Sequence, residues 1–247
     1  LPKNSPGRMP YGWYRIDYEL EGDLKDLDIF QFEKTLEKAT LDYTGWPAFI
    51  HLTRSELKPY EVDGLVECWV RPGDGESIDR LFYEAAHCDF WRGTPGRMFL
   101  LRGYDEDGGG RGRTELLNPG TIFDSTLPIW RLGEALLHAA NLADMIKSNS
   151  KSEIIVKFRV LYSGLSGRAL RSWARSYQSP FTLDAQVAKS DEAMLELSVR
   201  ADDIKNNLSD YIYPMIASLY ERFGVSNLSR EFVEYECGQL LNSRVDK

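Results

Sequence analysis

Three closely spaced arginines form the pattern in this chain that most resembles an anion-binding site. The segment 163–176 reads SGLSGRALRSWARS, and it places Arg168, Arg171 and Arg175 at positions i, i+3 and i+7. If the segment is helical, these side chains share one face. Clustered guanidinium groups bind phosphates and carboxylates through paired hydrogen bonds. We therefore expect contact with an anion, a nucleotide or a nucleic acid, and a solvated face with surface salt bridges is the alternative.

A second set of arginines stands among aromatic residues. Arg92 follows Trp91 directly, and Arg102 lies in the apolar segment 96–104. Aromatic rings can line a ligand pocket and stack on planar groups. Taking both patterns together, we predict a site for an anionic small molecule or a nucleic acid that is built from Arg92, Arg102, Arg168, Arg171, Trp91 and Trp130.

The same residues have a structural alternative. Aromatic side chains dominate the burial of protein cores, so each tryptophan is also a core candidate. A buried arginine needs a carboxylate partner. Asp89, Asp124 and Glu134 are close enough in sequence to serve in that way. The arginines would then be members of structural ion pairs and would not face a ligand.

An acidic triplet, Asp105, Glu106 and Asp107, precedes a run of glycines. Clustered carboxylates can hold Mg²⁺ or Ca²⁺, which would suit a metal-dependent phosphoesterase or nuclease. However, the spacing fits neither an EF-hand loop nor a phosphate-binding loop of the GxxxxGK[ST] type. We expect a mobile charged loop after a strand, with the metal-dependent enzyme as the alternative.

The remaining reactive residues form no recognisable catalytic set. His87 and Cys88 are adjacent, so on a helix their side chains point about 100° apart. His51 and His138 have no second histidine at metal-ligand spacing, and the SGLSG segment does not match a nucleophile elbow. We therefore predict no catalytic residue, no metal site and no cofactor.

Composition narrows the class of protein. The chain has 247 residues and a net charge of −8, which repels nucleic acid unless a local basic patch exists. Three widely separated cysteines are no disulfide framework and are typical of a reducing compartment, so we expect a cytoplasmic protein. The apolar runs are too short for a membrane span.

Apolar periodicity predicts a mixture of strands and helices, and hence an α+β fold. Residues 28–43 show helical spacing after Asp28, which is a favourable N-cap. Residues 126–148 form the clearest helix, with Thr126 as its N-cap and a face of small residues that calls for a closely packed neighbour. A further helix is predicted over 76–91, and strands over 13–20, 45–53, 63–70, 96–104 and 154–165.

The polar segment 148–153 is the predicted boundary between two parts of the chain. Residues 1–10 hold three prolines and are expected to be an arm or linker, followed by an N-terminal α+β part over 11–148. The C-terminal part, 152–244, is expected to pack with it as one unit. Its alternating segments predict a β-hairpin with two helices after it, over 181–188, 193–201, 202–224 and 228–242.

Four segments are similar to a known arrangement of domains. They read YTGWPAF, DFWRGTPGRMFLLRGYDED, PGTIFDSTLPIWRLGEALLHAANLA and SGLSGRAL. Together they resemble the region that follows a Schlafen-type AlbA_2 DNA-binding domain in some bacterial proteins. The resemblance implies a companion sensor or regulatory domain of a longer protein, in defence or transcription control. The AlbA_2 domain itself is not recognisable in this chain, and the resemblance transfers no catalytic residues.

The combined expectation is a non-enzymatic sensor, regulatory or interaction module of a larger bacterial protein. Its partners would be an anionic small molecule, a nucleic acid or another protein, and not a membrane. Self-association through the apolar stripes of the two C-terminal helices is also expected, since these stripes are wide. A purely structural assembly domain without a ligand is a further alternative.

Overall fold

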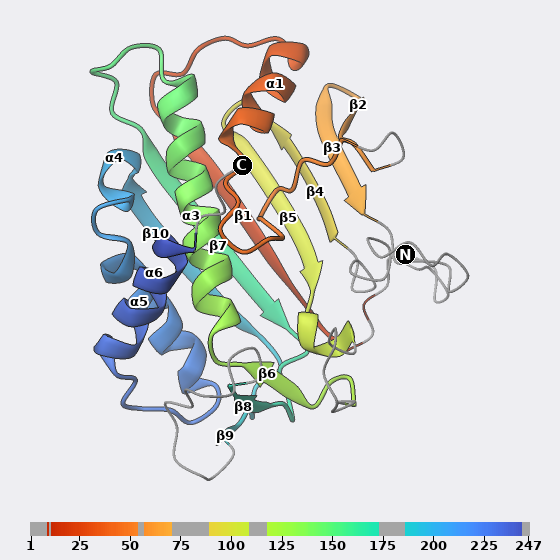
Figure 1. Cartoon of the computed structure of the whole chain (residues 1–247), viewed down its shortest axis with the longest axis vertical. Coiled ribbons are helices and arrows are strands. Elements are labelled where there is room, and N and C mark those ends of the chain that lie inside the picture. Colours follow the sequence, from red (N-terminus) through yellow and green to blue (C-terminus); the bar gives the residue numbers. More distant parts are fainter. Residues whose placement is uncertain are drawn as a thin grey trace.

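A computed structural model describes residues 9, 11–53, 57–70, 89–108, 118–172 and 186–243. These residues build a seven-stranded, antiparallel sheet with the strand order β10-β7-β1-β5-β4-β3-β2 (Figure 1). With its helices, this mostly antiparallel arrangement is the predicted α+β fold. In chain order the strands are β1 (Trp13–Glu21), β2 (Tyr60–Val62), β3 (Leu65–Val70), β4 (Asp89–Thr94), β5 (Arg97–Gly103), β7 (Ile155–Ser163) and β10 (Ala193–Arg200).

The central strand β1 shows why the sheet has two different faces. Its side chains alternate between buried and partly exposed along its length, as expected for a strand that covers a core on one side. The inward set is aromatic or aliphatic and includes Tyr14, Ile16 and Tyr18, whereas the outward set includes Asp17 and Glu19. One face of the sheet is therefore apolar and the other is largely polar.

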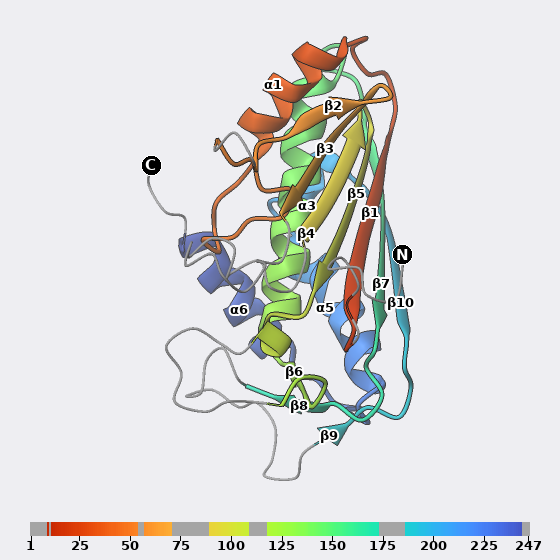
Figure 2. The ribbon, with the colours of Figure 1, turned by 90° about the vertical axis from the view of Figure 1, so that its right-hand side faces the viewer.

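The helices lie on the apolar face, and Figure 2 shows them on one side of the sheet. The longest, α3 (Leu127–Ile146), is buried along most of its length and contacts the sheet and the other helices. Its buried small residues allow the close packing that the sequence predicted. The other helices are α1 (Ile29–Ala39), α4 (Ala201–Ile204), α5 (Leu208–Glu221) and α6 (Arg230–Asn242).

The N-cap residue predicted from the sequence is observed at α1 but not at α3. Asp28 forms a capping box with Gln31 at the start of α1, as its type and position predicted. Thr126 makes no side-chain cap on α3. Asp124 takes that role, because its Oδ1 accepts hydrogen bonds from the backbone amides of Thr126 and Leu127.

A small second sheet explains why the predicted hairpin differs from the observed pairing. It has the order β6-β8-β9, with β6 (Ile122–Asp124), β8 (Ala169–Arg171) and β9 (Gln186–Val187). The strand β10 pairs with β7, while β9 pairs with β8, so the two segments expected to pair lie in different sheets. The predicted strand followed by helices is present, in β10, α4, α5 and α6. Residues 181–185 lie outside the described residues.

One other local prediction was wrong, and the condition for a shared arginine face, a helix in this segment, is not met at its described residues. Residues 45–53 were expected to be a strand, but they form bends and turns, with positive φ angles at Gly45 (75°) and Phe49 (56°). Arg168 and Arg171 do not share a helix face, because Arg168 ends a turn and Arg171 ends β8. Arg175 and most of the helix predicted over 76–91 lie outside the described residues, and β4 begins at Asp89.

The sheet is continuous across the predicted boundary at 148–153. β1 pairs along nine residues with β7, which follows that segment. The apolar stripes of α5 and α6 are used within the chain, since the residues that form them pack into the same core. Among the described helices, none is long and apolar enough to cross a membrane.

Gly164 should be far less tolerant of substitution than Gly167, although both have a φ near 80°. In either position, the left-handed backbone alone should cost an alanine about 1–2 kcal/mol. A Cβ at Gly164 would lie 2.5 Å from the Cα of Gly12, whereas Gly167 faces open space. We expect Gly164→Ala to lower the free energy of unfolding by at least about 2 kcal/mol more than Gly167→Ala in urea titrations. Equal losses would contradict the close approach.

Candidate functional site

The six residues predicted to form one ligand site occupy different environments. Trp91, Arg102 and Arg168 are buried in the core, each no more than 1% exposed. Trp130 is partly buried on α3, and Arg171 is exposed at the end of β8. Arg92 is exposed on the polar face of the large sheet. The structure brings Trp91 and Arg102 onto neighbouring strands β4 and β5, where both are buried. Arg92 follows Trp91 on β4 but is exposed, and the other three residues lie in other parts of the fold.

Arg168 is fully engaged in contacts within the chain. Its guanidinium forms a double hydrogen bond with the carboxylate of Asp107, at 2.9 and 2.5 Å. Its remaining bonds go to backbone carbonyls of Tyr11, Ile122 and Gly164. The group also lies 4.5 Å from the centre of the Tyr104 ring. Because its donors are already used, Arg168 has a structural role.

Arg102 forms the second buried ion pair. Its Nη2 lies 2.6 Å from Oδ2 of Asp89 and also donates to the carbonyl of Pro47. The indole of Trp46 donates to the same Asp89 oxygen at 2.8 Å. Asp89 was among the carboxylates available in the sequence, and it lies directly opposite Arg102 in the β4–β5 register. The structural alternative for this arginine is therefore the observed one.

The two predicted tryptophans hold other segments in place. Trp91 donates from Nε1 to the carbonyl of Ile50 at 2.8 Å and packs edge-on against Phe49. Trp130 donates to Glu236 at 2.7 Å, which joins α3 to α6. Each indole nitrogen thus has an internal acceptor, as a buried tryptophan requires.

The acidic triplet sits in a short 3-10 helix, η1 (Asp105–Gly108), and its carboxylates turn to different partners. Asp105 pairs with Arg131 at 2.7 Å, and Asp107 pairs with Arg168. Glu106 accepts a hydrogen bond from the backbone amide of Asp124 at 2.7 Å. Among the described residues no group of three or more histidine, cysteine or acidic side chains is arranged to hold a metal ion. These contacts make the triplet a structural element.

The loop over residues 42–48 forms a polar centre that the sequence did not reveal. Glu134 accepts hydrogen bonds from the backbone amides of Tyr43, Thr44 and Ala48. Arg131 donates to the hydroxyl of Thr44 and to the carbonyl of Trp46. Both side chains come from α3, which therefore fixes the loop that was expected to be a strand. Helical spacing of Arg131 and Glu134 was the available signal, but their backbone partners could not be predicted.

A small cavity of about 20 Å³ lies beside this centre, between η1 and the start of α3. Its lining includes the buried hydroxyls of Tyr14 and Tyr162, together with Arg131 and Glu106. A space of this size admits one water molecule. An organic ligand therefore has no room there.

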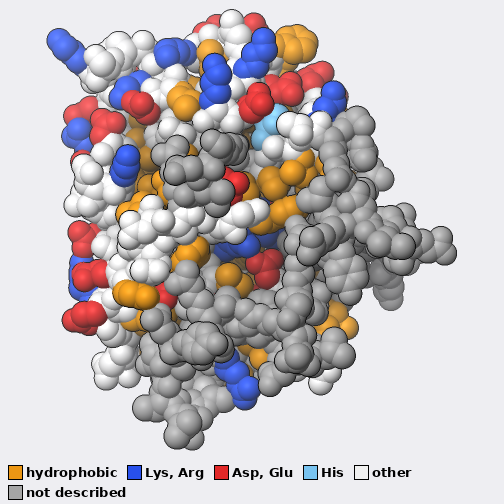
Figure 3. All heavy atoms as spheres, in the orientation of Figure 1, with side chains coloured by type: hydrophobic (Ala, Val, Ile, Leu, Met, Phe, Trp, Pro, Cys, Tyr) orange, Lys and Arg blue, Asp and Glu red, His pale blue; other side chains and the backbone are white. Residues whose placement is uncertain are grey.

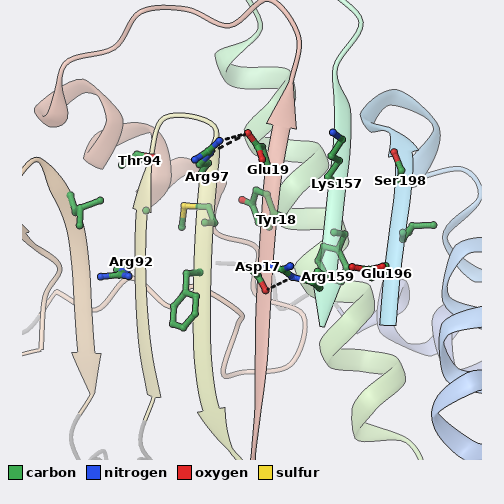
Figure 4. A pocket seen from close by; sticks show the side chains of 16 residues that line it. Asp17, Tyr18, Glu19, Arg92, Thr94, Arg97, Lys157, Arg159, Glu196 and Ser198 are labelled. Atoms are coloured by element: carbon green, nitrogen blue, oxygen red, sulfur yellow. Dashed lines mark hydrogen bonds and ion pairs between the residues drawn. The ribbon is translucent and has the colours of Figure 1, made fainter. Parts of the chain in front are cut away.

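The large cavity lies on the opposite face of the sheet, which none of the described helices covers (Figure 2). It has a volume of about 920 Å³ and spreads over β3, β4, β5, β1, β7 and β10 (Figure 4). Charged side chains project into it from neighbouring strands, with Arg97 beside Glu19 and Arg159 beside Asp17. The lining carries four cations and three carboxylates: Arg92, Arg97, Lys157 and Arg159, with Asp17, Glu19 and Glu196.

Most cations in this cavity have a carboxylate partner. Arg97 lies 2.6 Å from Glu19, Arg159 lies 2.6 Å from Asp17, and Lys157 pairs with Glu21. Sequence reasoning did not select these residues, although their alternation along β1 and β7 gave a signal for a polar face. The alternation could not predict which strands become neighbours in the sheet.

Arg92 differs from its neighbours in the cavity. Its guanidinium carbon lies 5.7 Å from the centre of the Phe99 ring, and Glu67 stands opposite it in the β3–β4 register. Within the described ranges, no carboxylate oxygen lies within ion-pair distance of this guanidinium. Of the six predicted residues, Arg92 is therefore the one that is exposed, lines the large cavity and has guanidinium donors not used by any described residue.

The helix-bearing side carries mixed charges in its described part (Figure 3). Figure 3 shows acidic and basic side chains interspersed over the described part of that surface, without a continuous basic area. Comparisons of the chain with protein-family models, with curated proteins and with solved structures found no match. The candidate site therefore rests on the geometry of the open sheet face.

Removing one partner of a buried ion pair should destabilise the chain strongly. Asp107→Ala leaves the guanidinium of Arg168 buried without its carboxylate, for which about 3–5 kcal/mol of lost stability is expected. The matched control is Glu19→Ala, which breaks the exposed pair with Arg97 and should cost less than about 1 kcal/mol. Urea titration of both variants measures the difference. Similar losses in the two variants would contradict a structural role for Arg168.

Glu106 should make stability fall as the pH rises from about 4.5 to about 8. Burial, and then repulsion from Asp124, raises the pKa of Glu106 from 4.5 to about 8. The folded state thus keeps a proton that the unfolded chain releases. Its stabilising contribution is complete below pH 4.5 and is lost as pH rises through about 8.

The variant Glu106→Gln isolates this contribution, because it keeps the acceptor oxygen and carries no charge. His138, whose pKa burial lowers from 6.5 to about 3, changes stability only at lower pH. Between pH 6.5 and 8, the free energy of unfolding should therefore fall less in the variant than in the parent chain. Parallel pH profiles from urea titrations would show that Glu106 is ionised in the folded state.

Proposed function

We propose that this chain is a non-enzymatic interaction module that docks an acidic polypeptide segment on the open face of its large sheet. Arg92 is the residue that receives an anionic side chain of that segment. The observation that carries the proposal is the contrast between the two faces of the sheet. One is covered by helices, and the other holds a cavity of about 920 Å³ with an exposed guanidinium that pairs with no carboxylate of the described residues.

The shape of the cavity favours a polypeptide over a small molecule. Small-molecule sites usually enclose most of the ligand within deep, mainly apolar walls. Here the lining comes from outward side chains of successive strands, so the cavity is broad and open. A partner segment can lie across several strands, with apolar contact to Phe99, Leu65 and Leu197 and a carboxylate near Arg92.

The charges of the cavity disfavour a nucleic acid. Three carboxylates are mixed with the four cations, and the chain as a whole carries a net charge of −8. A phosphate backbone that crossed the face would meet Asp17, Glu19 and Glu196 as well as the cations. Protein surfaces that bind nucleic acids usually carry a strong excess of positive charge.

The wider context follows from the resemblance noted in the sequence. A region that accompanies an AlbA_2 DNA-binding domain in a bacterial protein would serve as a regulatory companion, and a docking face suits that role. We propose that the chain senses or assembles with a protein partner in defence or transcription control. The alternative of a metal-dependent phosphoesterase or nuclease is weaker, since the carboxylates of the acidic triplet bind internal partners.

Arg92→Ala should weaken binding of a labelled acidic peptide that alternates glutamate and leucine. Loss of a charge-assisted contact worth about 1.5 kcal/mol corresponds to roughly a tenfold weaker affinity. The control is Arg222→Ala, which removes an exposed arginine at the end of α5, away from the cavity. Fluorescence anisotropy would measure both, with single-stranded DNA and inorganic phosphate as further probes. Peptide affinity that is unchanged in Arg92→Ala, or DNA binding that exceeds peptide binding, would overturn the proposal.

A further inference from the structure

The strand β10 forms one edge of the large sheet and has a long, open backbone. It contains eight residues and pairs with β7 on one side only. None of the described strands lies on its outer side. The strand contains no proline, which is one of the common means by which proteins protect such an edge.

The hydrogen bonds show which backbone groups face outward. The amide of Ala201 donates to the carbonyl of Ile154 at 2.8 Å, so this pair is a hydrogen-bonded pair of the antiparallel ladder. Such pairs alternate along a ladder. A second bond gives the same result. The amide of Leu20 donates to the carbonyl of Gly96, which fixes the alternation along β1, and the β1–β7 register carries it to β7 and so to β10. The N–H and C=O groups that point away from β7 therefore belong to Met194, Glu196, Ser198 and Arg200.

These outward groups have no hydrogen-bond partner among the described residues. The side chains of the same four residues are exposed, and Met194 is 50% exposed although it is apolar. The edge is thus a template for another extended chain, which would add main-chain hydrogen bonds.

The sequence of this edge is complementary to itself. Glu196 and Arg200 have opposite charges and stand at equal distances on either side of Ser198. A two-fold axis at Ser198 would place each Glu196 opposite Arg200 of a second copy, with outward backbone groups facing one another. An axis at Glu196 would instead bring two carboxylates together, which is unfavourable.

We propose that two copies of this chain associate through β10, antiparallel about a two-fold axis at Ser198, so that their sheets form one continuous sheet. The two open faces then lie side by side, because Glu196 and Ser198 also line the large cavity. This inference does not rest on the proposed function. Arg92 lies on β4, and three strands separate β4 from β10, so its substitution leaves the association unchanged.

Charge reversal with rescue tests the register. Glu196→Arg and Arg200→Glu should each place like charges opposite one another and shift the chain from dimer to monomer. The double variant Glu196→Arg with Arg200→Glu restores opposite charges across the axis and should recover the dimer. Sedimentation and light scattering at about 100 µM protein, where weak interfaces still associate, measure the state.

Contacts within one chain predict that the double variant is the most perturbed, whereas the dimer predicts that it recovers. The two explanations can therefore be distinguished. Glu196 stands opposite Arg159, and Arg200 pairs with Glu153, so the double variant should have the least stable monomer. Ser198→Pro provides a second test, since its outward amide donates nothing to β7 and its loss should abolish the dimer without unfolding the chain. A monomeric parent chain, a dimeric Ser198→Pro variant or a double variant without recovery would each overturn the proposal.

Discussion

The buried pair of Arg168 and Asp107 joins parts of the chain that are far apart in sequence. From the start of β8, one guanidinium reaches the carboxylate of η1 and the backbone at Tyr11, Ile122 and Gly164. Burying a guanidinium costs free energy that its hydrogen-bond partners offset, so the position of each of these segments depends on the others. This clamp ties the small sheet to the beginning of β1 and thereby to the large sheet.

The loop at residues 42–48 is likewise held by hydrogen bonds from side chains distant in sequence. This loop has no regular secondary structure, and its backbone groups bind side chains of α3 and β5 in place of neighbouring strands. Buried backbone amides and carbonyls need partners, and here Glu134, Arg131 and Arg102 supply them. Charged residues such as Arg102, which was expected to bind a ligand, therefore hold the core together. Our proposal accordingly places recognition on the opposite face of the sheet.

The two faces of the sheet thus differ in their contacts. The inner face and the helices bury the aromatic and aliphatic residues, with the buried ion pairs at one end of the sheet. The outer face carries alternating charges in exposed pairs that contribute little to stability, and this leaves their positions free for contact with a partner. The open edge of β10 extends that surface toward a second copy in our proposal.

The sequence by itself determined the α+β class, most of the helices and the alternating strands, because apolar periodicity is a local property. It also indicated Asp28 as a cap and Asp89 as an available partner for a buried arginine. It could not determine that Arg168 is satisfied internally while Arg92 is exposed, since the local sequence does not show which arginine meets a buried carboxylate. It could not show that residues 45–53 form a turn, or that the last strand pairs with β7. Only the tertiary structure decided these points, because strand order and the burial of each charge depend on contacts between residues distant in sequence.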